Sequence, residues 1–346
     1  MNTAPPDTAP PVSAPPVSAP HPLVDRFGRV HTDLRVSLTD RCNLRCTYCM
    51  PAEGPGWLAR AEVLEDDEVV RLVRIAVERL GVRSVRLTGG EPLLRRGLAG
   101  LVERIAPLGV ELSLTTNGIG LARTAAALRE AGLGRVNVSL DTLRPERFAA
   151  ITRRDRLGDV LAGLAAAKAA GLSPVKVNAV PVRGVNDDEL VDLVSFAAGH
   201  GYRMRFIESM PLDAQGAWDR SAMVSAAEIL AVLEERFDLV PVLRHGNAPA
   251  EEWRIAGTDA VVGVIASVTR PFCGGCDRVR LTADGQLRTC LFATAESDLR
   301  ALLRGGADDA AIEAAWRAAV LGKGPGHAIG SADFVRPDRP MSAIGG

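Results

Sequence analysis

Short runs rich in β-branched residues alternate with longer stretches of helical periodicity from Asp33 to about Ser209, and this alternation limits the folds open to the chain. A strand followed by a helix, repeated several times, is typical of a parallel sheet with crossover helices. Six such units are fewer than the eight of a closed barrel. We therefore predict an α/β fold built on an incomplete (β/α)6 TIM-type barrel, with its functional loops at the carboxyl ends of the strands. The predicted strands are 34–38, 82–88, 110–116, 136–140, 175–180 and 204–209, and the predicted helices are 66–80, 95–107, 121–132, 158–171 and 187–200.

The pattern changes after Gly216, which indicates a second and smaller unit of α+β type. There we predict a helix at 225–236, hairpin-like strands within 252–268 and 279–289, and helices at 295–304 and 309–320. The expected domains are a tail over 1–22, the barrel over 23–216 and a C-terminal domain over 217–346.

Residues 1–22 hold eight of the chain's 22 prolines and contain APPVS twice, which is typical of a disordered, polyproline-like tail. The segment lacks both the basic start and the continuous apolar stretch of a secretory signal. We therefore expect a cytoplasmic protein, whose cysteines stay reduced.

Charge and hydropathy exclude two classes of partner. Lys and Arg number 41 against 42 Asp and Glu, so no long-range field favours a nucleic acid or an anionic membrane. No apolar run reaches the roughly 18 residues of a membrane span. An anionic ligand must therefore be held by local contacts.

Six cysteines form two groups of three, and they are the strongest chemical signal in the chain. Three thiolates suit a cubane [4Fe-4S] cluster, in which one iron stays free for another ligand. The alternative is a zinc site that borrows a distant histidine, since structural zinc takes four ligands and none of the five histidines has ligand spacing with either group. The first group is Cys42, Cys46 and Cys49, and the second is Cys273, Cys276 and Cys290.

The string CNLRCTYC, with Tyr48 before its third cysteine, resembles the CxxxCxxC signature of radical S-adenosylmethionine enzymes. The resemblance implies that the open iron binds the amino and carboxylate groups of S-adenosylmethionine and that an injected electron cleaves it to a 5′-deoxyadenosyl radical. It also implies that the backbone of Gly90, in GGEP, receives the methionine amino group, with Ser139 and Met210 around the ribose and adenine. Taken alone, GGEP is an ordinary turn after a strand, Ser139 a loop residue and Met210 a core residue.

From Asp25 to Gly346 the chain resembles, more specifically, the members of this family that cyclise GTP in molybdenum cofactor biosynthesis. The most discriminating stretch is FCGGCDRVRLTADGQLRTCLF, which holds the second cysteine group. The resemblance implies a second [4Fe-4S] cluster that binds the guanine of GTP. It assigns the nucleotide to Arg35, Arg86, Thr115, Lys176, Arg278, Arg280 and the backbone of Val279.

The basic residues of the chain are consistent with binding of a nucleotide. The chain has no GxxxxGK[ST] loop, so phosphates must meet side chains, and guanidinium groups suit phosphate oxygens. For Arg86 and Arg205 the alternative is a salt bridge on a barrel strand. Lys176 lies between two valines in a buried-strand pattern and therefore needs a partner.

The chain ends in Gly345 and Gly346, which by themselves indicate only a frayed terminus. The resemblance implies instead that this tail enters the active site beside Arg35, Arg278 and Arg280 and takes part in catalysis.

For the reaction, the resemblance implies that hydrogen is taken from C3′ of the ribose and that C3′ then bonds to C8 of guanine. It further implies a flavodoxin- or ferredoxin-like electron donor and a separate synthase that converts the product to cyclic pyranopterin monophosphate; a homodimer stays open. Two alternatives remain. One is a radical enzyme that modifies a peptide, and the other is a zinc-binding regulator that uses the barrel as a scaffold.

Overall fold

The computed structural model describes residues 21–243, 246–331 and 334–345. Most of the predicted proline-rich tail, residues 1–20, lies outside this part of the chain. Among the described residues, no helix has both the length and the apolar character needed to span a membrane.

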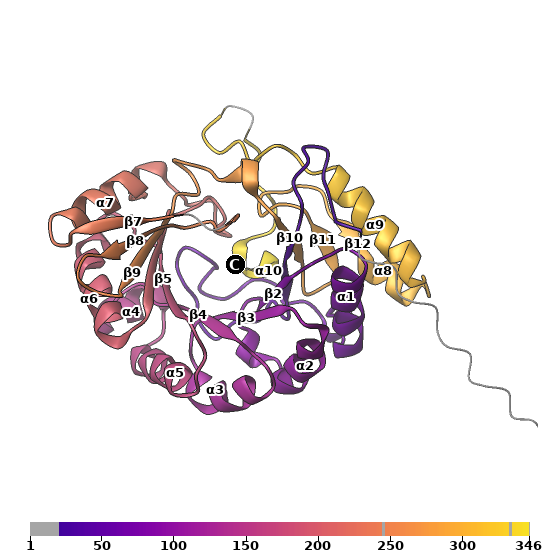
Figure 1. The fold of residues 1–346 in the computed structure, drawn as a ribbon, viewed down its shortest axis with the longest axis horizontal. Coiled ribbons are helices and arrows are strands. Elements are labelled where there is room, and N and C mark those ends of the chain that lie inside the picture. Colours follow the sequence, from indigo (N-terminus) through magenta and orange to yellow (C-terminus); the bar gives the residue numbers. More distant parts are fainter. Residues whose placement is uncertain (1–20, 244–245, 332–333, 346) are drawn as a thin grey trace, which may run out of the picture.

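Six parallel strands form the barrel, and each lies within two residues of its predicted bounds. Helices cover the outside of this curved sheet (Figure 1). The strands are β1 (Asp33–Ser37), β2 (Ser84–Thr88), β3 (Glu111–Thr116), β4 (Arg135–Ser139), β5 (Val175–Ala179) and β6 (Arg203–Ile207). The outer helices are α1 (Asp66–Glu78), α2 (Leu98–Ile105), α3 (Leu121–Glu130), α4 (Pro145–Thr152), α5 (Leu157–Ala169) and α6 (Leu190–His200).

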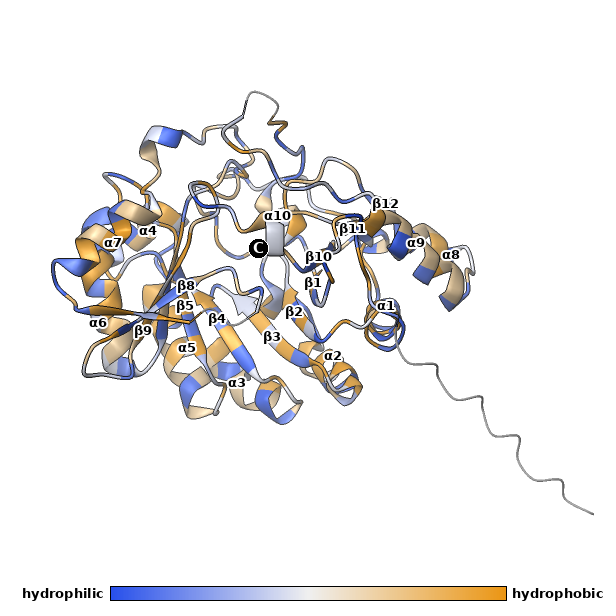
Figure 2. Ribbon diagram, turned by 45° about the horizontal axis from the view of Figure 1, so that its top comes forward, coloured by the Kyte–Doolittle hydropathy of each residue, from blue (hydrophilic) through white to orange (hydrophobic). Residues whose placement is uncertain are grey.

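Alternation along the strands separates an apolar outer face from a polar interior, and Figure 2 shows hydrophobic and hydrophilic residues alternating there. On β1, Leu34 and Val36 are fully buried in the hydrophobic core, whereas Arg35 lines the internal cavity. The strand register places Arg35 beside Arg86 on one side and beside Arg280 on the other. The ladders thus bring three guanidinium groups into one layer of the interior.

The strands after Gly216 extend both edges of the barrel sheet. The strand order is β12-β11-β10-β1-β2-β3-β4-β5-β6-β9-β8-β7, with β10 parallel to β1 and β9 parallel to β6. The predicted hairpins are confirmed, but they continue the first sheet and do not start another, because an open barrel leaves two edges with unpaired backbone groups. The division after Gly216 stays a prediction. The elements are α7 (Ala226–Glu234), β7 (Leu239–Val242), β8 (Glu251–Ile255), β9 (Val261–Ile265), β10 (Arg278–Leu281), β11 (Gln286–Arg288), β12 (Ser297–Asp298), α8 (Leu299–Arg304), α9 (Asp309–Leu321) and α10 (Met341–Ile344).

Candidate active site

The first cysteine group lies in the loop that follows β1, and the end of α4 holds this loop in place. The backbone amide of Arg45 donates to the Thr152 carbonyl at 2.9 Å, and that of Thr47 donates to the Ile151 carbonyl at 3.0 Å. Arg153, in the left-handed conformation at the end of α4, donates from Nη1 to the Arg45 carbonyl at 3.0 Å. We did not predict α4.

The thiols of this group lie in a shared recess, where burial raises the pKa of each. For Cys49, burial and the neighbouring Cys42 raise the pKa to about 12. Two N–H groups point at sulfur: Leu44 N lies 3.4 Å and Asn117 Nδ2 3.8 Å from Cys42 Sγ. Three clustered thiols with N–H donors and little positive charge fit an iron–sulfur cluster, because the metal supplies the charge that thiolates need.

Among the described residues, no three His, Cys, Asp or Glu side chains lie close enough to hold a single metal ion. A cubane does not require that arrangement, because each of its cysteines binds a different iron.

The GGEP turn packs directly against the backbone of the first cysteine loop. Gly90 N donates to the Thr39 carbonyl at 2.7 Å, and Glu91 N donates to the Arg41 carbonyl at 2.7 Å. A Cβ at Gly90 would lie 2.3 Å from the Asp40 carbonyl oxygen, so only glycine fits there. Close approach to the cysteine loop is therefore one reason for this glycine.

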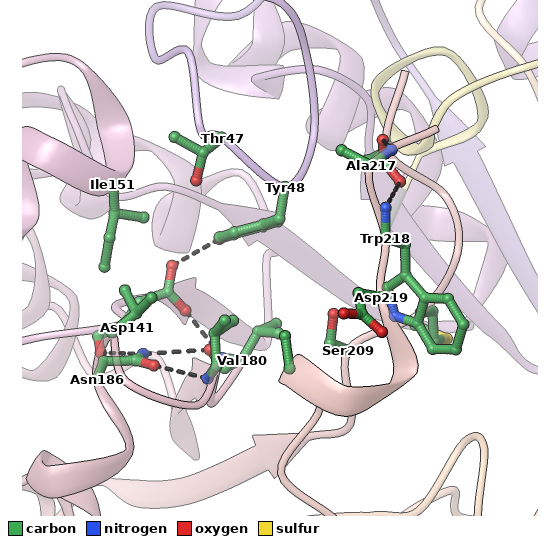
Figure 3. A pocket seen from close by; sticks show the side chains of 15 residues that line it. Thr47, Tyr48, Asp141, Ile151, Val180, Asn186, Ser209, Ala217, Trp218 and Asp219 are labelled. Atoms are coloured by element: carbon green, nitrogen blue, oxygen red, sulfur yellow. Dashed lines mark hydrogen bonds between the residues drawn. The ribbon is translucent and has the colours of Figure 1, made fainter. Parts of the chain in front are cut away.

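Three of the residues assigned to S-adenosylmethionine, Tyr48, Gly90 and Ser139, line the recess of the first cysteine group. Met210 lines the adjoining pocket together with Tyr48, which Figure 3 shows from close by. In that pocket the Tyr48 hydroxyl donates to Asp141 Oδ2 at 2.6 Å, and Val180 N donates to Asp141 Oδ1 at 2.9 Å (Figure 3). We missed Asp141 in the sequence, although a carboxylate directly after a barrel strand was an available signal.

The second cysteine group lines the main cavity, at the side of the barrel that β10 and β11 close. Phe292 N lies 3.5 Å from Cys290 Sγ, and Lys323 Nζ lies 3.7 Å from Cys276 Sγ. Burial raises the pKa of Cys273, but at Cys276 the positive charges of Lys323 and Arg278 outweigh burial and lower the pKa of the thiol. Two cations, Lys323 and Arg278, therefore lie close to the thiol of Cys276.

Five arginines line the main cavity, which also holds the second cysteine group and shares Tyr48, Thr115 and Ser139 with the recess of the first. Burial and neighbouring guanidinium groups lower the pKa of several of them, as expected where cations lie together without enough anions. Within the described chain, the Nε atoms of Arg35 and Arg278 are buried without a hydrogen-bond partner. These groups fit an anionic ligand. The five are Arg35, Arg86, Arg205, Arg278 and Arg280.

The salt-bridge alternative for Arg86 and Arg205 finds no support in the part of the chain that the structure describes. Arg205 donates to the side-chain oxygens of Asn178 at 3.0 Å and Asn137 at 2.9 Å, which are neutral groups. Arg86 Nε lies 3.5 Å from Ser113 Oγ. Neither arginine forms a salt bridge within the described residues, although the charge of Asp33 acts on Arg86 and that of Glu252 on Arg205.

Of the other residues assigned to GTP, Thr115 lines the main cavity, whereas Lys176 and Val279 do not. Lys176 lines a second cavity near the amino ends of the strands, which shares Arg86, Arg205 and Arg278 with the main one. Burial and Arg205 lower the pKa of Lys176 to about 7. The Val279 side chain is fully buried in the core, because alternation on β10 turns Arg278 and Arg280 inward and Val279 outward.

The C-terminal helix α10 lies inside the barrel, where Figure 1 shows the end of the described chain. Ser37 Oγ donates to the Ile344 carbonyl at 2.8 Å, and Arg280 Nη1 donates to the Gly345 carbonyl. Gly345 has φ +84°, and a Cβ there would lie 2.1 Å from Ser37 Oγ. The structure thus places Gly345 beside Arg280, while Gly346 lies outside the described residues.

Two family models match successive parts of the chain. Residues 36–197 match the radical SAM superfamily, and residues 202–329 match the family described as molybdenum cofactor synthesis C. A protein of Streptomyces coelicolor named GTP 3′,8-cyclase is 63% identical over 330 residues, covering 94% of this chain and 97% of the relative. One of Mycobacterium tuberculosis named GTP 3′,8-cyclase 2 is 61% identical over 332 residues, covering 94% and 92%.

Among solved structures, Streptococcus suis SuiB bound to precursor peptide SuiA matches with a TM-score of 0.59 at 14% identity, covering 86% of this chain and 69% of that one. At this identity the likeness shows the fold alone. It confirms the predicted partial barrel.

Proposed function

The chain belongs to the GTP 3′,8-cyclases, which are radical S-adenosylmethionine enzymes of molybdenum cofactor biosynthesis, and we propose that it cyclises GTP in the cavity between its two cysteine groups. The observation that carries this proposal is the set of five arginines that line the main cavity beside the second cysteine group, two of which have a buried Nε without a hydrogen-bond partner among the described residues. A nucleotide fits these residues, because its phosphates match the arginines and its nucleobase can reach the second cysteine group.

Radical S-adenosylmethionine enzymes hold a [4Fe-4S] cluster and S-adenosylmethionine. In this chain Cys42, Cys46 and Cys49 would hold the cluster, and Tyr48, Gly90, Ser139 and Met210 would surround S-adenosylmethionine. When bound, the cluster supplies the electron that cleaves S-adenosylmethionine to methionine and a 5′-deoxyadenosyl radical. Asp141 fixes the Tyr48 hydroxyl and so keeps the tyrosine ring at the edge of this pocket.

We propose that Cys273, Cys276 and Cys290 would hold a second [4Fe-4S] cluster, whose iron without a cysteine ligand would bind the guanine of GTP. Their thiols line the main cavity, and the N–H donors around them suit cluster sulfurs as at the first group.

The triphosphate is assigned to the interior cations. Arg35, Arg86, Arg278 and Arg280 present guanidinium groups to the cavity, and Lys176 extends the positive charge toward the amino ends of the strands. Thr115 and the Val279 backbone complete the nucleotide contacts. Because these cations are buried near one another, an incoming polyanion relieves their mutual repulsion as it binds.

The reaction removes hydrogen from C3′ of GTP, forms a bond between C3′ and C8, and ends with one electron and one proton added to give 3′,8-cyclo-7,8-dihydro-GTP. The protein's own residues orient C3′ against C8 and exclude water. Gly345 lies beside Arg280, and we propose that the tail formed by Gly345 and Gly346 takes part in catalysis together with Arg35, Arg278 and Arg280.

Further partners follow from the same proposal. The electron comes from a flavodoxin- or ferredoxin-like donor in the cytoplasm, and a separate synthase converts the product to cyclic pyranopterin monophosphate. A homodimer stays open.

The test is anaerobic incubation of the purified protein with reductant, S-adenosylmethionine and GTP, followed by measurement of 5′-deoxyadenosine and of GTP. We expect both S-adenosylmethionine cleavage and GTP loss in the wild type, and neither in Cys42→Ala. Cleavage of S-adenosylmethionine without any loss of GTP would favour a peptide substrate. A colourless protein that contains zinc and no iron would favour the regulator.

A further inference from the structure

Lys323 lies in a glycine-rich turn after α9 that neither the sequence motifs nor the proposed reaction explains. Its side chain is almost fully buried, at 3% exposure. The turn is fixed by Arg29, whose guanidinium donates to the carbonyls of Gly324 at 2.7 Å and Pro325 at 3.0 Å. The same guanidinium donates to the Cys273 carbonyl at 2.8 Å, so it ties this turn to the second cysteine group.

Three acceptors surround the Lys323 ammonium. Nζ lies 2.9 Å from the Arg278 carbonyl oxygen, 3.4 Å from His31 Nδ1 and 3.7 Å from Cys276 Sγ. A lysine ammonium has three N–H donors and no acceptor, so this set matches its protonated form. One of the three donors is therefore directed at the sulfur of a cysteine that we assign to the second cluster.

A buried chain of hydrogen bonds holds the ammonium in this position. If His31 Nδ1 accepts from Lys323, then Nε2 carries the hydrogen and donates to Asp25 Oδ2, which lies 3.0 Å away. Arg29 Nε donates to the same carboxylate oxygen at 2.6 Å. His31 and Asp25 are both buried, so the orientation of Lys323 is set by the fold and not by solvent.

We propose that Lys323 is a positioning residue that raises the reduction potential of the second cluster by a charge-assisted hydrogen bond to the Cys276 sulfur. Hydrogen bonds to cluster sulfurs and nearby positive charge favour the reduced state, which carries one more negative charge. The first cysteine group has donors from Leu44 and Asn117, both neutral, to its sulfur. Cys276 thus receives charged donors, from Lys323 and from Arg278 Nη1 at 3.9 Å, whereas the Arg45 guanidinium near Cys42 donates to a carbonyl and not to the sulfur. The inference rests on the second cluster of the proposed function.

The test is a redox titration of the full-length protein followed by electron paramagnetic resonance, with the second-cluster signal identified by its loss in Cys276→Ala. In Lys323→Met we expect a more negative midpoint, with at least a tenfold change in the reduction equilibrium, which is 59 mV for one electron. Lys323→Arg keeps the charge and should restore most of the wild-type value. Lys168→Met is the matched control, because Lys168 is exposed and donates to the His200 carbonyl, remote from both cysteine groups.

A second measurement detects the contact in the wild-type protein itself, with Lys168→Met as its control. The chain has only three lysines, so labelling their ammonium groups with 15N gives few 15N couplings in the electron paramagnetic resonance of the reduced cluster. We expect a 15N coupling to the reduced second cluster of the wild type, and its retention in Lys168→Met. Absence of the coupling, or an unchanged midpoint in a cluster-loaded Lys323→Met, would overturn the role of Lys323 alone. If Cys276→Ala loses no electron paramagnetic resonance signal of the wild type, the assignment of the second cluster is wrong, and the inference is wrong with it.

Discussion

Replacement of Gly345 by alanine tests most directly whether GTP conversion needs the C-terminal tail to lie inside the barrel. The added Cβ would lie 2.1 Å from Ser37 Oγ and 2.8 Å from Thr88 Cγ2, distances that no real Cβ tolerates. The residue also has φ +84°, which strains any side-chain-bearing residue by about 1–3 kcal/mol. If the tail moves away, the bond from Arg280 to the Gly345 carbonyl is lost, and a hydrogen bond to a charged group contributes about 1.5–3 kcal/mol.

The overlap, which costs about 1–3 kcal/mol, and the backbone strain together disfavour the inserted tail of the variant by about 3 kcal/mol, which corresponds to roughly a hundredfold lower population and rate. The assay is the rate of GTP conversion, with iron content and S-adenosylmethionine binding measured in parallel and expected unchanged. Gly184→Ala is a matched control, because Gly184 also has positive φ but nothing lies within 4 Å of its added Cβ. Normal GTP turnover in a cluster-loaded Gly345→Ala would refute the reasoning and show that the tail has no role in catalysis.

Four further outcomes are expected. Cys42→Ala abolishes 5′-deoxyadenosine formation, since two thiolates do not hold the first cluster in place; substantial formation would contradict the assignment. Cys290→Ala keeps the first cluster but weakens GTP binding, measured by equilibrium dialysis, and unchanged affinity would argue against a guanine contact. Burial and Lys323 lower the pKa of His31 to about 4, so the stabilisation that comes from this shift is present above pH 6.5 and is lost, by about 3 kcal/mol, as the pH falls toward 4. The free energy of unfolding, measured with urea at pH 7 and pH 5, should fall less in His31→Gln than in the wild type, and equal falls would contradict the shift. Deletion of residues 1–20 leaves GTP turnover intact, because a proline-rich segment adds no core, and a large loss would assign it a function.

The barrel was predictable because its strands are short apolar runs with a strong period. On β1 the outward Leu34 and Val36 give that signal, and the inward Arg35 interrupts it at a functional position. The family assignment, which rests on the cysteine and GGEP motifs, is confirmed by relatives that match along nearly the whole chain.

What the sequence did not predict depends on short elements or on distant pairing. Helix α4 has only eight residues, too few for a clear period, yet its last carbonyls hold the first cysteine loop. The addition of β9 and β10 to opposite edges of the barrel depends on partners far away in the chain. The contacts of Lys323 could not be predicted for the same reason, because His31 and Cys276 approach it only after folding.

The pairing of β1 with β10 also sets a condition on biosynthesis. At the usual pace of translation, roughly 10 to 50 seconds separate the emergence of Asp33 from that of Arg278. During this interval the β1 edge of the growing parallel sheet stays unpaired, and an unpaired edge is a template for pairing with other chains. Ribosome-associated chaperones are therefore expected to shield β1, and iron–sulfur assembly proteins to act on the second cysteine group only after synthesis is almost complete.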